Sequence, residues 1–157
     1  MRLRAAGQER IVSTKTGFTD DERAAMQQRA EELRSTKGLK GAARLAKELE
    51  ACVAAIDALE GVDRQVASAL HRIVTEVAPD LAPKTWYGFP SYASDGDVVV
   101  FYQPASKFDT RYGTVGFQQD AALDDGPMWA TSFAVVDVTP DVEERLRELV
   151  AKAVGAA

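Results

Sequence analysis

The chain has 157 residues, a formal net charge of −5, one cysteine and one histidine. The single cysteine excludes an internal disulfide and a zinc site built on several cysteines, and the single histidine excludes a metal site built on several histidines of one chain. The acidic balance argues against binding to nucleic acid, which favours a basic surface. We therefore expect a soluble protein with one ordinary domain and an extension.

The beginning of the chain predicts a tail followed by a solvated helix. Residues 1–17 are polar and charged without a sustained period, which is typical of a flexible tail. Thr19 and Glu22 then form a capping box, which predicts the start of a helix over residues 20–34. Its apolar face is thin, so this helix needs a partner surface to be stable. Homodimer formation through the first helices is one way to provide such a surface.

Two stronger amphipathic helices follow. Apolar residues recur at steps of three or four over residues 42–59 and again over residues 62–78, so each helix has one apolar face. Cys52 lies on the first of these faces, which predicts a buried and inert thiol. We divide the chain into the tail, a helical extension over residues 18–50, and a domain over residues 51–157.

The pattern changes to strands in the second half of the chain. Residues 98–103 are almost continuously apolar, as expected for a central strand that is covered on both faces. Ser94–Asp97 predicts a hairpin turn, and Pro90 predicts a break between two short extended pieces. The order of elements predicts an α+β fold, in which an antiparallel sheet at about residues 85–138 is packed by helices on one face.

The aromatic residues are concentrated in the same half, since eleven of the 12 lie between Trp86 and Phe133. Several motifs occur there in order: Trp-Tyr-Gly-Phe-Pro from Trp86, Gln-Pro-Ala-Ser-Lys-Phe from Gln103, the pair Arg111-Tyr112, Leu-Asp-Asp-Gly from Leu123, and Trp129. Each motif is weak alone, but the ordered set resembles the YdhG-like family, a bacterial domain family of uncertain biochemistry. The resemblance covers roughly residues 55–155.

The resemblance implies a compact two-layer fold that has been compared with frataxin. One branch of the family is described as intracellular iron chaperones. For this chain the resemblance implies a non-enzymatic cytoplasmic accessory protein that binds iron weakly on exposed carboxylates and passes it to a partner protein in iron-cluster assembly. Carboxylate oxygens suit hard cations, and the local candidates are Asp95, Asp97, Asp120, Asp124 and Asp125, of which Asp120, Asp124 and Asp125 are the predicted ligands. A plainer interpretation is that all five cap turns and keep the surface soluble.

A second hypothesis follows from the residues themselves. Lys107 and Arg111 are four positions apart on a short loop, and each is next to an aromatic residue. Arginine offers a planar fork to a carboxylate or phosphate, and Trp and Tyr side chains can form the walls of a site. This indicates a module that binds a small anionic ligand or a peptide through Trp86, Tyr87, Lys107, Arg111, Tyr112 and Trp129. Alternatively, the aromatic rings form the core and the two cations pair with Asp124 or Asp125.

The sequence indicates neither catalysis nor a membrane location. His71 is the one candidate for acid–base chemistry near neutral pH, but no nucleophile lies near it in sequence, and its helical position favours packing at a helix edge. There is no phosphate-binding loop and no dinucleotide fingerprint. The longest apolar run, Val98–Tyr102, is only strand-length, and the basic N-terminus lacks the apolar segment of a secretory signal. We predict no catalytic residues, no membrane span and a cytoplasmic location.

Overall fold

The computed structural model describes residues 17–156, so the predicted tail lies outside the described residues except for Gly17. The predicted helices and the central strand are confirmed, with ends within two residues of the predicted bounds. The elements are α1 (Asp20–Ser35), α2 (Gly41–Asp57), α3 (Gly61–Val77), β1 (Ala82–Trp86), β2 (Phe89–Ser94), β3 (Asp97–Gln103), α4 (Ala105–Phe108), β4 (Gly113–Phe117), β5 (Ser132–Val135) and α5 (Pro140–Ala153).

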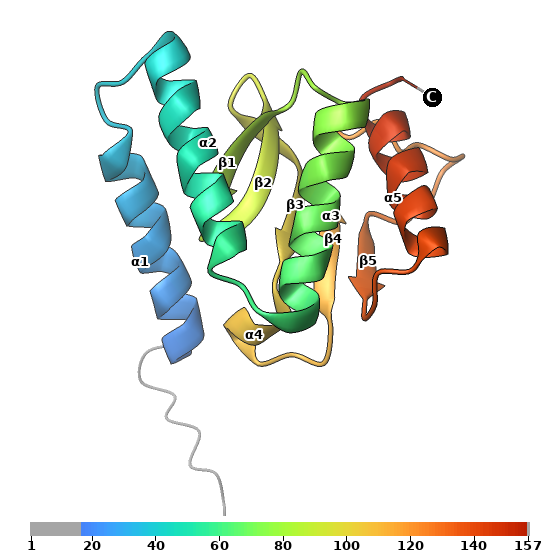
Figure 1. Cartoon of the computed structure of the whole chain (residues 1–157), viewed down its shortest axis with the longest axis horizontal. Coiled ribbons are helices and arrows are strands. Elements are labelled where there is room, and N and C mark those ends of the chain that lie inside the picture. Colours follow the sequence, from blue (N-terminus) through green and yellow to red (C-terminus); the bar gives the residue numbers. More distant parts are fainter. Residues whose placement is uncertain (1–16, 157) are drawn as a thin grey trace, which may run out of the picture.

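The five strands form one antiparallel sheet in the order β1-β2-β3-β4-β5, so each strand pairs with its neighbours in sequence. β3 lies at the centre of the sheet, as its continuous apolar run predicted. Figure 1 shows α2, α3 and α5 on one face of this sheet. The predicted α+β architecture, with helices packed on one face of an antiparallel sheet, is therefore confirmed.

The core lies between the sheet and these three helices. Directly paired residues of neighbouring strands share a face, so the pairs Tyr92–Val100 and Tyr102–Val115 line the same side of the sheet. All four are fully buried, and removing this apolar surface from water is the main stabilising contribution to the fold. The helices complete the core with Cys52, Ile56, Val66, Leu70, Ile73, Val74, Leu146 and Val150.

The opposite face of the sheet carries a second set of aromatic rings. Phe101 is paired with Ser91 on one side and with Gly116 on the other, so these three residues point away from the core. The Phe101 ring packs edge-on against Trp86, with 5.4 Å between ring centroids, and stacks with Phe89 at 6.2 Å. A side chain at Gly116 would collide with the Phe101 ring, so the absence of one lets this ring pack closely against β4.

Two tight turns join the first three strands. The predicted turn is confirmed at Asp95-Gly96, where both residues have positive φ, 50° and 88°. The break predicted at Pro90 is wrong, because Pro90 lies inside β2 and the chain turns instead at Tyr87-Gly88, with φ of 54° and 80°. Positive φ at both central residues suits a tight hairpin turn. A positive φ is rare for an aromatic residue such as Tyr87, so Gly88 is the one sequence signal for this turn.

The apolar face of α2 is only partly covered. Cys52 and Ile56 are buried, whereas Leu45 and Leu49, nearer its start, are 52% and 41% exposed. α2 packs on β1 and β2, so the division that we placed after residue 50 falls inside a helix that contributes to the core. Among residues 17–156, no helix combines the length and the apolar character needed to cross a bilayer.

The environment of Cys52 gives a first testable prediction. Its side chain has no exposed surface, and burial raises the pKa of the thiol to about 11. Because the thiolate is the reactive form, we expect the folded chain to resist an aromatic disulfide reagent at pH 8 and the unfolded chain to react with one equivalent. Absorbance of the released thiolate, with and without denaturant, measures both states. Rapid labelling of the folded chain would contradict the buried position.

Candidate functional site

Three of the predicted binding residues, Trp86, Tyr87 and Lys107, meet at one end of the sheet. Trp86 ends β1, and its ring packs edge-on against that of Tyr87, with 5.2 Å between centroids. Lys107 lies on α4, and its ammonium is 5.7 Å from the centre of the Phe89 ring, which also contacts the Phe108 ring at 5.8 Å. The β1–β2 turn and α4 thus form one region, called here the turn surface: Trp86, Tyr87, Gly88, Phe89, Lys107 and Phe108.

The turn surface binds a carboxylate that the sequence did not reveal. Glu32 of α1 accepts hydrogen bonds from the backbone N–H groups of Gly88, at 2.7 Å, and of Tyr87, at 3.2 Å. Consecutive N–H groups in a turn of positive φ form a small concavity that suits an anion. The Glu32 side chain is only 14% exposed, and Arg29 of the same helix pairs with it at 3.3 Å. No sequence pattern marks Glu32, because its partners are backbone groups 55 and 56 residues away.

Lys107 is held beside the same turn. Its ammonium donates a hydrogen bond to Gln28 Oε1 of α1, and a side chain at Gly88 would collide with both groups. Burial lowers the pKa of Lys107, while the nearby carboxylates of Glu32 and Asp21 oppose this shift. Lys107 is therefore a half-buried cation that faces α1 across the turn.

The other predicted binding residues do not join the turn surface. Arg111 is exposed, and its guanidinium lies 5.5 Å from the ring centre of its neighbour Tyr112. Trp129 is 39% exposed in the long connection between β4 and β5. Within the part of the chain that the structure describes, neither Lys107 nor Arg111 forms a salt bridge with the acidic residues of that connection, so the pairing that we considered from the sequence is not observed.

A second carboxylate fixes α4 in place. Asp63, in the first turn of α3, accepts hydrogen bonds from the Tyr102 hydroxyl at 2.6 Å and from the backbone N–H groups of Ala105 and Ser106 at 2.8 and 3.0 Å. The first N–H groups of a helix lack partners within it, so Asp63 caps α4 from a distance. Burial opposes the ionisation of Asp63, but these hydrogen bonds outweigh it and lower its pKa. No sequence pattern pairs Asp63 with α4, because their hydrogen-bonded residues are 42 and 43 positions apart.

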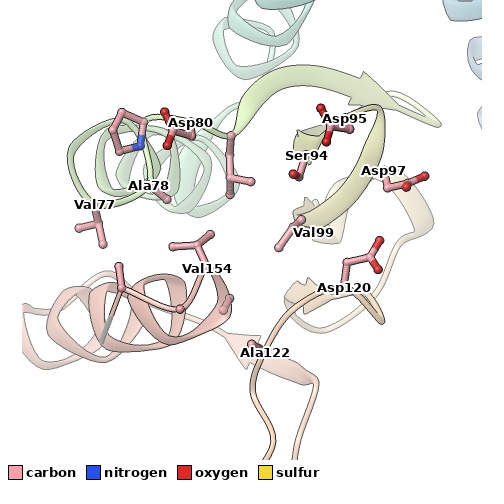
Figure 2. A pocket seen from close by; sticks show the side chains of 15 residues that line it. Val77, Ala78, Asp80, Ser94, Asp95, Asp97, Val99, Asp120, Ala122 and Val154 are labelled. Atoms are coloured by element: carbon pink, nitrogen blue, oxygen red, sulfur yellow. The ribbon is translucent and has the colours of Figure 1, made fainter.

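The other end of the sheet holds a cavity of about 690 Å³, lined by 15 residues. Figure 2 shows Asp95, Asp97 and Asp120 together on one side of it and Val77 and Val154 on the other. Its remaining lining residues are Ala78, Pro79, Asp80, Leu81, Ser94, Val99, Ala122, Ala153, Gly155 and Ala156. The cavity therefore combines an apolar wall with four carboxylates.

The electrostatics of this cavity favour a positive charge. α3 ends at Val77 and α5 at Ala153, and the C-terminal end of a helix carries partial negative charge. None of the 15 lining residues is Lys, Arg or His. Within residues 17–156, none of the four carboxylates of the cavity is in a salt bridge. Direct ion pairs within this part of the chain therefore do not neutralise them, while Arg29 and Lys84 line a neighbouring cavity together with Asp97 and Asp120.

Asp120 is the one predicted metal ligand that lines the cavity. Asp124 and Asp125 are exposed further along the β4–β5 connection and do not line it. Among residues 17–156, no three His, Cys, Asp or Glu side chains lie close enough together to hold a metal ion. The carboxylates of the cavity are therefore spread around a volume rather than focused on one point.

His71 is packed at the edge of the core. Its Nδ1 lies 3.0 Å from the Tyr92 hydroxyl, and burial lowers its pKa. Burial also raises the pKa of Tyr92 well above its ordinary value. At neutral pH both groups are therefore uncharged, which fits a packing contact at a helix edge.

Comparisons with known proteins identify no relative: no family model, no curated protein and no solved structure matches the chain. The resemblance to the YdhG-like family therefore rests on its ordered motifs alone.

Asp63 gives a prediction for stability and its dependence on pH. Asp63→Asn replaces one of the two carboxylate oxygens by an NH₂ group that faces one N–H donor of α4, so we expect the free energy of unfolding at pH 7 to fall by about 2 kcal/mol. Folding lowers the pKa of Asp63, so its stabilisation is complete above the ordinary carboxyl pKa of about 4 and is lost as the pH falls through the lowered value. The difference between parent and variant should therefore shrink in acid.

Urea unfolding of both chains over a series of pH values measures this difference. Asp124→Asn removes an exposed carboxylate and is the matched control, which should leave the stability almost unchanged. An Asp63→Asn chain as stable as the parent at pH 7 would contradict the capping role of Asp63.

Proposed function

We propose that this protein is a non-enzymatic binding module whose cavity takes a small organic cation with an apolar body. One observation carries the proposal: four carboxylates and two helix C-termini surround a cavity of about 690 Å³ that has an apolar wall and no basic lining residue. The charged group of the ligand would lie beside Asp95, Asp97 and Asp120. Its apolar part would pack against Val77 and Val154.

The size and the chemistry of the cavity both suit such a ligand. Sites for small molecules commonly have volumes of about 300–1,000 Å³ and combine apolar walls with a few polar groups that fix orientation. Exposed carboxylates give a modest attraction that salt weakens. We therefore expect apolar contact to supply most of the affinity and the carboxylates to select the sign of the charge.

Weak iron binding, followed by transfer to a partner protein in the cytoplasm, is the second candidate function. It is implied by the resemblance to the YdhG-like family and supported by the position of Asp120 among the carboxylates of the cavity. Carboxylate oxygens suit iron ions. Because no three potential ligands converge within residues 17–156, iron would be held there through water as well as by protein oxygens.

The other hypothesis from the sequence, a module for an anionic ligand or a peptide, is supported at the turn surface. Two backbone N–H groups there already hold a carboxylate, that of Glu32, and Lys107 stands beside it. Arg111 and Trp129 lie elsewhere, so this proposed site is limited to the turn surface.

Calorimetric titration with n-hexylammonium tests the leading proposal, with 1-hexanol and hexanoate as its neutral and anionic counterparts. We expect hexylammonium to bind with an affinity that falls as salt is raised, and the two counterparts to bind at least tenfold more weakly. Asp95→Asn combined with Asp120→Asn should weaken hexylammonium binding about fivefold. Failure of hexylammonium to bind, or equally tight binding of 1-hexanol, would sink the proposal.

Asp124→Asn combined with Asp125→Asn is the matched control, because it removes the same charge outside the cavity. It should leave hexylammonium binding unchanged. Ferrous and ferric iron titrated into the same variants test the second candidate. Iron binding that weakens in the Asp95 and Asp120 variant supports iron in the cavity, whereas weakening in the control variant alone places iron on the β4–β5 connection.

A further inference from the structure

We propose that the turn surface is a docking site for an acidic amphipathic helix of a partner protein, and that α1 occupies this site as an internal competitor. The proposal deepens the binding role proposed for the turn surface and does not depend on the acidic cavity. The expected partner helix carries a glutamate that binds the N–H groups of Tyr87 and Gly88. It also carries a large apolar residue seven positions before that glutamate.

The turn surface is already shaped to receive a carboxylate on a helix. The N–H groups of Tyr87 and Gly88 both donate to Glu32, and the positive φ of both residues keeps the two N–H groups on the same side of the turn. Gln28 lies one helical turn before Glu32 on the same face of α1, and it accepts a hydrogen bond from Lys107. The turn surface therefore binds side chains at two positions of a helix, a carboxylate at one and a neutral polar group at the other.

α1 is attached by these polar contacts rather than by apolar burial. Ala25 is its only buried residue, while Met26 and Leu33 remain 40% and 53% exposed. Segments with few buried apolar contacts open at a low free-energy cost compared with the core. A helix with the same polar contacts and more apolar burial can therefore displace α1.

An apolar groove of about 390 Å³ lies where that extra burial is available. Its lining includes Ala25 and Met26 of α1 and the rings of Phe89 and Phe108 on the turn surface. Ala25 and Glu32 are seven positions apart, so they lie on one face of α1 about two turns from each other. A partner helix with leucine, methionine or phenylalanine at the position of Ala25 would fill this groove while its glutamate made the same two hydrogen bonds.

The unfilled groove also argues for a partner protein rather than a second copy of this chain. A second copy would bring the same α1, with the same alanine beside the groove, and would gain no burial over the helix already there. α1 belongs to the predicted extension over residues 18–50, whereas the turn surface is formed by two of the ordered motifs, those that begin at Trp86 and Gln103. α1 therefore covers part of the surface where these two motifs meet.

Fluorescence anisotropy with labelled peptides and the full-length chain tests the proposal. The probe is a peptide of residues 18–37 that carries Ala25→Leu. Two further peptides serve as comparisons: the unchanged sequence, and the probe with Glu32→Gln added. We expect the probe to bind the chain at least tenfold more tightly than either of them. Glu32→Gln in the chain itself should raise the affinity for the probe about tenfold, because α1 then competes less strongly.

Glu31→Gln in the chain is the matched control. Glu31 immediately precedes Glu32, is 67% exposed and pairs with Arg34 rather than with the N–H groups of the β1–β2 turn. This variant should leave the affinity for the probe unchanged. A chain with Gln28→Cys and Lys107→Cys, joined by a short bismaleimide, should keep α1 docked and lose probe binding relative to the same chain left unlinked. Cross-linking is checked by mass spectrometry.

Three results would overturn the proposal. The first is equal affinity of the three peptides, and the second is equal affinity of the parent and the Glu32→Gln chains for the probe. The third is binding of N-acetylglutamate amide to the Glu32→Gln chain when none of the peptides binds. In that last case the turn surface would bind small anions but would not dock a helix. Failure of helix docking is therefore distinguishable from failure of the anion-binding role proposed for the turn surface.

Discussion

The carboxylate of Asp63 joins three elements of the fold. It lies at the start of α3, and its donors are the Tyr102 hydroxyl on the central strand and two N–H groups of α4. A buried charge is costly unless it is fully hydrogen-bonded, and three donors meet that requirement here. One side chain thus links the helical layer, the sheet and α4. The positions of Lys107 and Phe108 on the turn surface depend on this link.

The two ends of the molecule differ in the charge that they favour, and the helices explain part of the difference. α3 begins near α4 and ends at the cavity, and α5 also ends there. The N-terminal end of a helix favours anions and the C-terminal end favours cations. Where α3 begins, the carboxylate of Asp63 is bound by N–H donors. Where α3 ends, four carboxylates that form no salt bridge within residues 17–156 surround an open volume.

The sequence predicted the elements better than it predicted their long-range polar contacts. α2 and α3 carry a clear apolar period and β3 a continuous apolar run, both of which burial imposes, so their positions could be derived, and a capping box marks the start of α1. Glu32 and Asp63 could not be found in this way, because their partners are backbone groups of distant segments. Lys107 and Arg111 have helical spacing, but α4 ends at Phe108 and Asp109 takes a left-handed conformation, which separates the two cations.

Gly88 carries two requirements at one position. Its φ of 80° suits glycine, and a side chain there would collide with Gln28 and Lys107. The first requirement belongs to the shape of the hairpin, and the second belongs to the attachment of α1. A single substitution at Gly88 would disturb the shape of the hairpin and the seating of α1 together, so one residue couples the mechanical integrity of the two segments.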